Sequence, residues 1–216
     1  MERGYRDGAR AVLPLMVAVL GFGISFGVLA RSAGMGIVAP IVMSATTFAG
    51  SAQFAAASVL SSGGTVSAAV GAAVLLNSRY GPIGVSVAPS LEGSRLSRFL
   101  HAQLVVYESW AIAAEGDGRF NRRVLVASGL AIYVGWVTGT TIGVAFGDVI
   151  GDPSRLGLDA AFPALFIALV APQLGSRSMK VVALLGAAIA LALTPLTPVG
   201  VPIIAASLAC VVGARR

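Results

Sequence analysis

The most restrictive feature of this sequence is a succession of long apolar runs separated by short clusters of charge. The runs are about 16 to 24 residues long, and an α-helix needs roughly 20 mainly apolar residues to cross the hydrocarbon core of a bilayer. They lack the strict alternation in polarity that the strands of a transmembrane barrel would show. The chain is therefore predicted to be an all-α, polytopic transmembrane helical bundle.

Composition supports the same interpretation and excludes several functions. Of 216 residues, 56% are hydrophobic and 11% are charged, which is far from the balance of a soluble domain. The net charge of +6 is not gathered into a basic stripe with aromatic residues, so no nucleic-acid partner is expected. A single cysteine, Cys210, allows no internal disulfide and no thiol-based metal site. No catalytic residue, metal or cofactor is predicted.

The runs predict about eight spans in a single integral membrane domain, residues 1–216. Their expected bounds are 11–30, 37–60, 65–88, 99–114, 124–147, 158–174, 179–194 and 199–213. With the N-terminus in the cytoplasm, ten basic residues fall inside and four outside, as the positive-inside rule requires. Both termini are therefore expected in the cytoplasm. The first run is longer than the apolar core of a cleaved signal peptide, so a retained span is predicted.

A weak internal similarity occurs at a shift of about 115 residues. It relates the first three runs to the fifth, sixth and seventh, and predicts a parallel 4+4 repeat, with chance matching among small apolar residues as the open alternative. Two glycine pairs, Gly23 with Gly27 and Gly139 with Gly143, have the spacing that lets membrane helices pack closely. Candidate kinks lie at Pro82, Pro163 and Pro202.

The second run is unusually polar for a span. Its hydroxyl and amide side chains belong to Ser44, Thr46, Thr47, Ser51, Gln53 and Ser58. Lipid offers such groups no hydrogen-bond partner, so they either join neighbouring helices or line a path that water can enter.

Two charges are predicted to lie at membrane depth. Arg79 in the third run costs at least about 2.5 kcal/mol near the bilayer centre unless it has a partner or faces water. Glu108 in the fourth run is its expected counter-charge. Asn77 before Arg79 and Gly81 after it predict a polar site, where the helix is either continuous or unwound. The alternative is a structural ion pair that locks two helices. His101, on the same predicted helix face as Glu108, is either an interfacial residue or a proton relay.

Four stretches resemble the AzlC family: "FAGSAQF", "NSRYGPIG", "YESWAIA" and "LDAAFPALFIALVAPQL". The resemblance covers essentially the whole chain. Members are the large subunits of bacterial branched-chain amino acid exporters. It implies a multi-pass protein of the cytoplasmic membrane, export of branched-chain or related small amino acids, and a small multi-span AzlD-like partner.

The resemblance also carries over a set of substrate-binding residues: Phe48, Gly50, Ser51, Gln53, Phe54, Asn77, Arg79, Tyr80, Tyr107 and Glu108. Two of these positions depart from the family pattern. Tyr80 stands where histidine is common and Tyr107 where aspartate is common, which removes two ionisable groups and leaves proton coupling and the substrate in question.

Together these residues predict a route for an amino acid through the membrane. On this route Ser51, Gln53 and Asn77 would supply the hydrogen bonds that water otherwise provides. Arg79 attracts the carboxylate of an amino acid, and Glu108 attracts its ammonium group, pairs with Arg79, or carries a coupling proton. Phe48, Phe54 and Leu76 would form an apolar wall. A membrane-embedded enzyme acting on lipid and a scaffold without transport are the alternatives.

Overall fold

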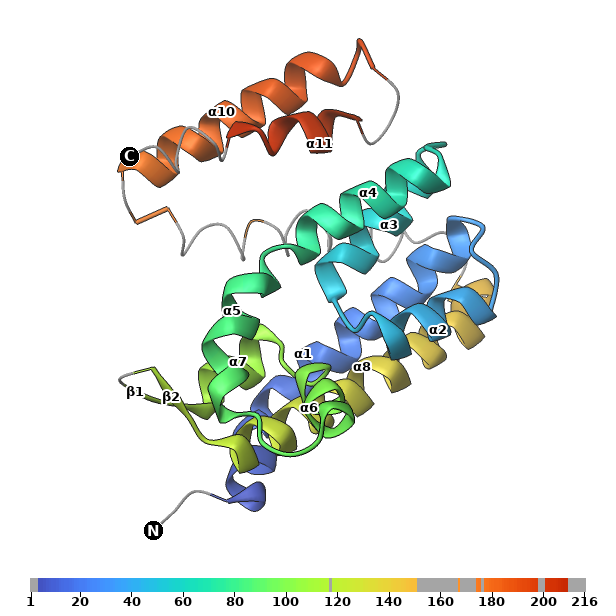
Figure 1. Ribbon diagram of the computed structural model, residues 1–216. Coiled ribbons are helices and arrows are strands. Elements are labelled where there is room, and N and C mark those ends of the chain that lie inside the picture. Colours follow the sequence, from blue (N-terminus) through green and yellow to red (C-terminus); the bar gives the residue numbers. More distant parts are fainter. Residues whose placement is uncertain are drawn as a thin grey trace.

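The structure, a computed structural model, describes residues 4–116, 118–150, 167, 174–175, 177–197 and 201–209. Helices account for most of these residues (Figure 1). They are α1 (Tyr5–Ser32), α2 (Val38–Thr46), α3 (Gly50–Ser61), α4 (Val66–Asn77), α5 (Tyr80–Val87), the 3-10 turn η1 (Ala88–Ser90), α6 (Arg95–Ala102), α7 (Tyr107–Ala113), α8 (Arg122–Ile150), α10 (Arg177–Leu193) and α11 (Val201–Ala206).

The predicted helical fold is thus confirmed, with one small exception. Strands β1 (Ala114–Gly116) and β2 (Arg119–Phe120) form a short antiparallel hairpin between α7 and α8. Glycines with positive φ at Gly116 and Gly118 allow the tight reversal. The hairpin returns the chain to the start of α8.

Helices α1 and α8 form a continuous pair that runs through the molecule (Figure 1). Among the described residues, these are the two helices long and apolar enough to cross a membrane. A Cβ added at Gly23 would lie 3.1 Å from Gly139 Cα, and one added at Gly147 would lie 3.4 Å from Arg31 Cβ. The helices therefore run parallel, and the predicted close packing at the glycine pairs is confirmed.

The second, third and fourth predicted spans are each interrupted in the described chain. Helix α2 is separated from α3 by residues 47–49, α4 from α5 by 78–79, and α6 from α7 by 103–106. The sequence did not decide whether the second and third spans are continuous, and in the structure each consists of two helices. For the fourth, the expectation that His101 and Glu108 share one helix face is wrong, because they belong to different helices.

Local chemistry explains where the third span breaks. Pro82 has no amide hydrogen, and its ring would clash with the carbonyl four residues earlier if the helix were continuous. Helix α4 accordingly ends at Asn77, and α5 begins at Tyr80, so that Pro82 lies in the first turn of a new helix. At the kink predicted at Pro82, α4 and α5 are therefore separate helices, joined by Ser78 and Arg79 with right-handed helical backbone angles.

Beyond α8, the described chain contains a hairpin of α10 and α11, with α11 packed against α4. Helix α10 corresponds to the seventh predicted span. Of the sixth predicted span, only Ile167 and Leu174 are among the described residues, so Pro163 lies outside them. Cys210 also lies outside the described residues. Pro202 is the second residue of α11. The count of eight spans and the repeat are not confirmed by these residues and stay predictions.

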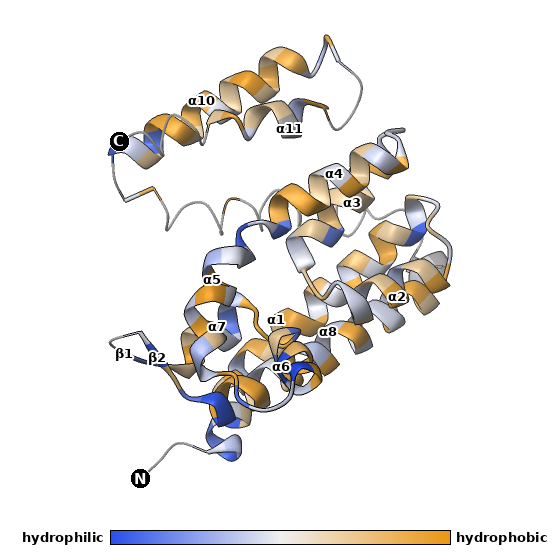
Figure 2. Cartoon of the chain, in the orientation of Figure 1, coloured by the Kyte–Doolittle hydropathy of each residue, from blue (hydrophilic) through white to orange (hydrophobic). Residues whose placement is uncertain are grey.

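The distribution of apolar side chains is typical of a surface that meets lipid. Large hydrophobic residues are widely exposed, among them Val17, Val74, Val85, Leu184 and Leu191. Figure 2 shows apolar residues along both sides of the helices and hydrophilic residues gathered mainly near the N-terminus, the start of α8 and the helix breaks. The buried core lies where α1, α3 and α8 meet, around Phe26, Phe54 and Trp136.

Candidate functional site

The break between α2 and α3 is held by side chains rather than by a turn motif. Phe48 has φ of +43°, a left-handed conformation that costs a non-glycine residue about 1–3 kcal/mol. The Tyr133 hydroxyl of α8 donates a hydrogen bond of 2.9 Å to the Ala45 carbonyl, and the Ala49 amide donates one of 3.3 Å to Gln53 Oε1. Both sides of the break therefore have partners for their backbone groups.

Gln53 is fully buried in a polar network inside the core. Its Nε2 donates to Ser44 Oγ at 2.8 Å, and the Trp136 indole donates to its Oε1 at 3.0 Å. Ser44 in turn shares a hydrogen bond of 2.9 Å with Thr140 of α8. This network joins α2, α3 and α8 around the break. Gln53 borders neither of the two cavities described below.

Arg79 lies in the break between α4 and α5 and turns toward α3 and α7. Its Nη2 donates to Ser51 Oγ at 2.6 Å. Its guanidinium carbon lies 5.2 Å from the centre of the Tyr80 ring and 5.0 Å from that of Tyr107, within the range of cation–π attraction. The Arg79 Nε is buried and has no hydrogen-bond partner, so the guanidinium has unused donor capacity.

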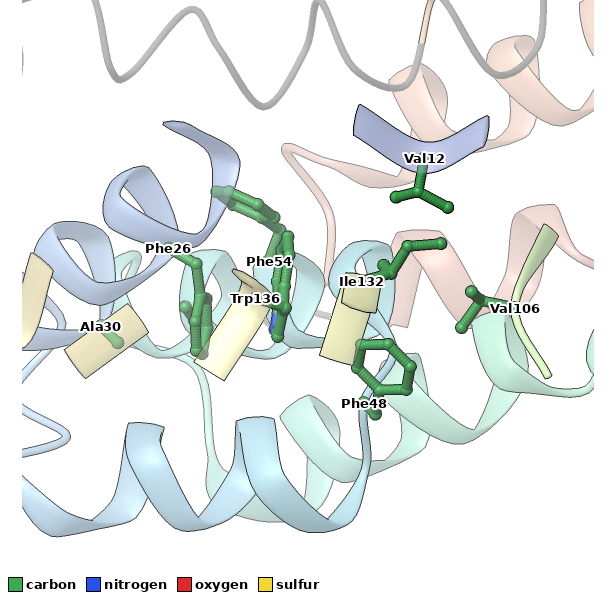
Figure 3. Packing of buried hydrophobic residues seen from close by; sticks show 9 residues of the cluster. Val12, Phe26, Ala30, Phe48, Phe54, Val106, Ile132 and Trp136 are labelled. Carbon is green, nitrogen blue, oxygen red and sulfur yellow. The ribbon is translucent and has the colours of Figure 1, made fainter. Parts of the chain in front are cut away.

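These residues border a first cavity of about 170 Å³ between α1, α3, α5, α7 and α8. Its polar side consists of Ser51, Arg79, Tyr80, Tyr107 and Glu108. Its apolar side consists of Leu15, Ala18, Val19, Phe22, Phe48, Val106, Ile132 and Trp136. Figure 3 shows Phe48, Ile132 and Val106 lying near one another on this side.

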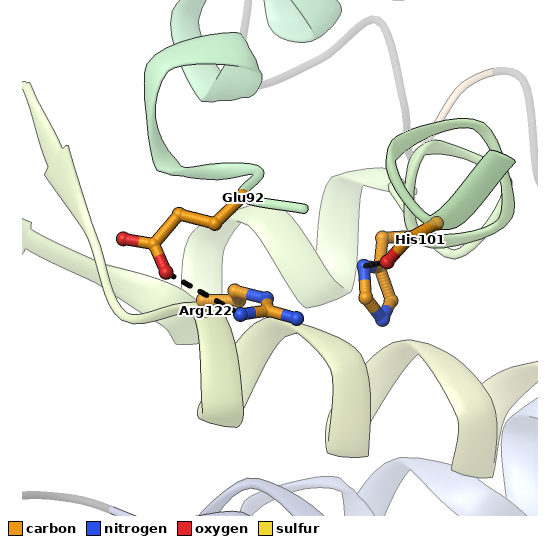
Figure 4. A network of polar contacts seen from close by, with 4 residues as sticks. Glu92, His101 and Arg122 are labelled. Atoms are coloured by element: carbon orange, nitrogen blue, oxygen red, sulfur yellow. Dashed lines mark hydrogen bonds and ion pairs between the residues drawn. The ribbon is translucent and has the colours of Figure 1, made fainter. Parts of the chain in front are cut away.

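The two predicted counter-charges border the same first cavity. Glu108 is exposed in the first turn of α7, whereas Arg79 is partly buried at the start of α5. Their side chains form no ion pair; the ion pair seen between described residues joins Arg122 to Glu92 at 3.5 Å (Figure 4). Arg79 and Glu108 thus border the same first cavity without pairing with each other.

A second cavity of about 180 Å³ lies where all three helix breaks meet. It is lined by Thr47, Phe48, Ala49, Asn77, Tyr80, Ala102, Gln103 and Val105. Asn77 Oδ1 is buried and accepts no hydrogen bond. Phe48 and Tyr80 border both cavities, so these two aromatic side chains lie between them.

The structure brings most of the predicted site residues together. The first cavity collects Phe48, Gly50, Ser51, Arg79, Tyr80, Tyr107 and Glu108, and Asn77 lines the second. Gln53 and Phe54 lie in the core instead. Leu76 packs against the α3–α4 core and is not among the residues that line the first cavity. His101 contacts Ser97 at 3.4 Å and borders neither cavity (Figure 4).

Sequence reasoning missed the contributions of α1 and α8. Val19 and Phe22 line the first cavity from α1, and Ile132 and Trp136 line it from α8. The signal that could have revealed α8 is a tryptophan in an otherwise apolar run, because a buried indole needs a hydrogen-bond acceptor. Here Gln53 supplies it. No cluster of residues suited to hold a metal ion occurs in the described part of the chain.

The described chain is a helical membrane protein in which interrupted helices surround two cavities beside a continuous helix pair. It belongs to the AzlC family: the family model "AzlC protein" matches residues 14–150. An uncharacterized membrane protein of Archaeoglobus fulgidus is 31% identical over 207 residues, 95% of this chain and 91% of that protein. The branched-chain amino acid transport protein AzlC of Bacillus subtilis is 28% identical over 176 residues, 78% of this chain and 67% of that protein. No solved structure matches the chain.

Proposed function

We propose that this protein is a secondary transporter that exports branched-chain or related small amino acids across the cytoplasmic membrane of a bacterium. The name of the Bacillus subtilis relative supports the substrate class. The site supports it independently, because an amino acid with an aliphatic side chain needs charged partners for its main-chain groups and an apolar wall for its side chain.

Arg79 is the observation that carries the proposal. Arg79 borders the first cavity, its guanidinium forms no ion pair with a described carboxylate, and a hydrogen bond to Ser51 fixes its direction. A guanidinium is a strong partner for a carboxylate because its planar donors match both oxygens. The N-termini of α3 and α5 border the same cavity and favour negative charge further. The substrate carboxylate binds at Arg79.

The apolar side of the first cavity accepts the branched side chain. Phe48, Val106 and Ile132 are buried there. Each methylene in such a pocket changes binding by only about 1–3 kcal/mol. Leucine, isoleucine, valine and methionine are therefore expected to compete, with modest preferences.

The energy source follows from sequence and from the remaining charge. The chain has no phosphate-binding loop for ATP, so an ion gradient is the expected source. Glu108 borders the first cavity without an ion-pair partner and is the proposed proton carrier and partner of the substrate ammonium. A small AzlD-like subunit and cytoplasmic termini complete the proposal.

The decisive experiment measures release of preloaded labelled leucine, isoleucine, valine and methionine from cells that express the chain with and without its small partner. Arg79→Ala should abolish release, and Arg79→Lys should restore only part of it, because lysine lacks the planar donor pair. Ser58→Ala is the matched control, since Ser58 lies on α3 away from both cavities. Normal release by inserted Arg79→Ala protein would refute the assignment.

A further inference from the structure

Helices α2 and α3 form a first hairpin, with its tip at residues 47–49, that reaches only halfway along α8. Helix α2 follows directly on the end of α1, and Ser44 shares a hydrogen bond of 2.9 Å with Thr140 of α8. Phe48 at the tip packs on Tyr133 with ring centroids 5.1 Å apart, about two helical turns nearer the start of α8. Helix α3 then turns back, because Gln53 bonds to Ser44 at 2.8 Å. Both arms therefore extend toward the end where α1 stops.

Helices α6 and α7 form a second hairpin, with its tip at residues 103–106, that comes from the opposite end. Glu92, just before α6, pairs with the first residue of α8 at 3.5 Å. Leu104 at the tip lies beside Gly129, about two helical turns further along α8. The chain then returns through α7, since the Asn121 amide before α8 donates to the Ala113 carbonyl at the end of α7 at 2.9 Å. Both arms therefore meet the end where α8 starts.

The lengths of the helices agree with these directions. The four hairpin arms have between 7 and 12 residues, so each is at most about 18 Å long, well short of the hydrocarbon core of about 30 Å. Residues 66–87, which comprise α4 and α5, extend about 33 Å. Helix α4 packs on α3, and Val87 at the end of α5 clusters with Val124 near the start of α8 (Figure 1). The α4–α5 segment therefore crosses from one end of the molecule to the other.

Arg79 connects the two tips from the break in this crossing segment. Its Nη2 donates to Ser51, the second residue of α3, at 2.6 Å. Its guanidinium carbon lies 5.0 Å from the ring of Tyr107, the first residue of α7. Both tips border the first cavity, at Phe48 and Val106. The first cavity thus lies between two tips that come from opposite ends.

We propose that the two hairpins are re-entrant, entering the membrane from opposite sides, and that they act as the two gates of the first cavity, held together by the Arg79 contacts. Each hairpin fills half of the membrane depth beside α8, so movement of one opens the cavity to one side only. Interrupted helices at this depth are tolerated where they are buried in protein or line a cavity. The mode of insertion stands by itself, whereas the role as gates rests on the proposed function.

The arginines support this insertion. If both segments crossed fully, Arg95 and Arg98 would lie outside, as predicted from the sequence. With re-entrant hairpins, every arginine outside the helix breaks in the described part of residues 4–150, except Arg31, lies at the end where α1 and α8 begin, as the positive-inside rule favours for a cytoplasmic end. These residues are Arg6, Arg10, Arg95, Arg98, Arg119, Arg122 and Arg123.

Labelling of single cysteines in intact cells tests the insertion. Cys210→Ala protein receives one new cysteine at a time, at an exposed position near an end of a helix: Tyr5→Cys, Ile37→Cys, Ser62→Cys or Glu92→Cys. A membrane-impermeant maleimide is applied before and after the membrane is made permeable. Ser62→Cys should label from the same side as Ile37→Cys, and Glu92→Cys from the same side as Tyr5→Cys. Full spans would give the reverse pairing, and either pair labelling from opposite sides would overturn the proposal.

A second measurement tests the Arg79 contacts in purified protein in detergent. Ala49→Cys and Val106→Cys each place a thiol at a buried tip, so the rate of its modification by N-ethylmaleimide reports opening of that tip. Ser51→Ala should raise the rate at Ala49→Cys about tenfold, as for a lost hydrogen bond to a charged group. Tyr107→Leu should raise the rate at Val106→Cys roughly threefold, because the lost cation–π contact is weaker.

Two controls make this result specific. Ser58→Ala removes a hydroxyl from α3 away from both cavities and should leave both rates unchanged. Ser128→Cys is fully buried in α8 and should stay unmodified in every variant, which shows that the fold is retained. Equal rates in Ser51→Ala and Ser58→Ala protein would overturn the role of Arg79 between the tips.

The outcomes separate this proposal from the proposed function. The expected labelling pairs in a protein that releases no amino acid would leave the insertion standing and refute the transporter assignment, and with it the role as gates. Release that depends on Arg79, with Ser62→Cys labelled from the side of Tyr5→Cys, would overturn the re-entrant hairpins and leave the transporter assignment standing.

Discussion

The continuous pair α1–α8 and the interrupted segment from α2 to α7 differ in how their backbones are stabilised. In the pair, glycines of one helix pack against the backbone of the other. A Cβ added at Gly139 would lie only 2.6 Å from the Leu20 carbonyl oxygen. In the interrupted segment, side chains such as Tyr133 and Gln53 bond backbone groups that a regular helix would satisfy itself. The close contact between α1 and α8 thus supports the interrupted segment, whose helix breaks and charged residues line the cavities.

The largest expected effect breaks the continuous pair. Gly143→Val would drive a side chain into the Ile24 backbone, and because backbone cannot move aside the two helices must separate. We expect destabilisation of about 3 kcal/mol or more, seen as loss of the monodisperse peak in fluorescence-detected gel filtration. Gly21→Val is the matched control, since nothing lies within 4 Å of a Cβ added at Gly21. Equal behaviour of the two variants would contradict the packing described.

A comparable effect is expected at the junction between the two regions. Gln53→Leu would leave the Trp136 indole and the Ser44 hydroxyl without one partner each, and the Ala49 amide without its acceptor. Each buried polar group left unsatisfied costs about 1–3 kcal/mol. The apparent melting temperature in detergent should fall, and the Trp136 emission should shift. A melting curve identical to that of the unchanged protein would argue against the network.

The break at Phe48 allows a sharper comparison between two variants of one residue. Phe48→Ala and Phe48→Gly both remove the ring that packs on Tyr133 with centroids 5.1 Å apart. Only glycine also relieves the cost of the φ of +43°. Phe48→Gly should therefore melt above Phe48→Ala, with a free-energy difference of about 1 kcal/mol. The reverse order would mean that the left-handed backbone is not required there.

The smallest effect is expected at the edge of the interrupted segment. Arg122 and Glu92 form an ion pair of 3.5 Å, but their side chains are 36% and 79% exposed. Such exposed pairs contribute at most about 1 kcal/mol. Glu92→Gln should leave the melting temperature and amino-acid release nearly unchanged. A large loss of either would show that this contact matters more than its exposure implies.

Much of the site could be predicted because burying charge is costly. Arg79 and Glu108 were predicted to face a shared wet space from that cost alone, and they border one cavity. Their ion pair was not found, because Arg79 is held by Ser51, Tyr80 and Tyr107 instead. Gln53 was expected on the route, yet it lies in the core. An amide is equally suited to line water or to bond buried neighbours, and polarity alone does not distinguish the two.

The sequence by itself determined that this is a helical membrane protein, because long apolar runs need lipid and glycine spacing permits close helix contact. Its likeness to the AzlC family is carried by particular stretches such as "FAGSAQF". The sequence also marked the residues whose charge or polarity is too expensive to leave in lipid. Only the tertiary structure decided where the helices break and which cavity each end borders. Those outcomes depend on contacts between segments far apart in the chain, such as Tyr133 with Ala45 and Arg79 with Ser51, which no local pattern encodes.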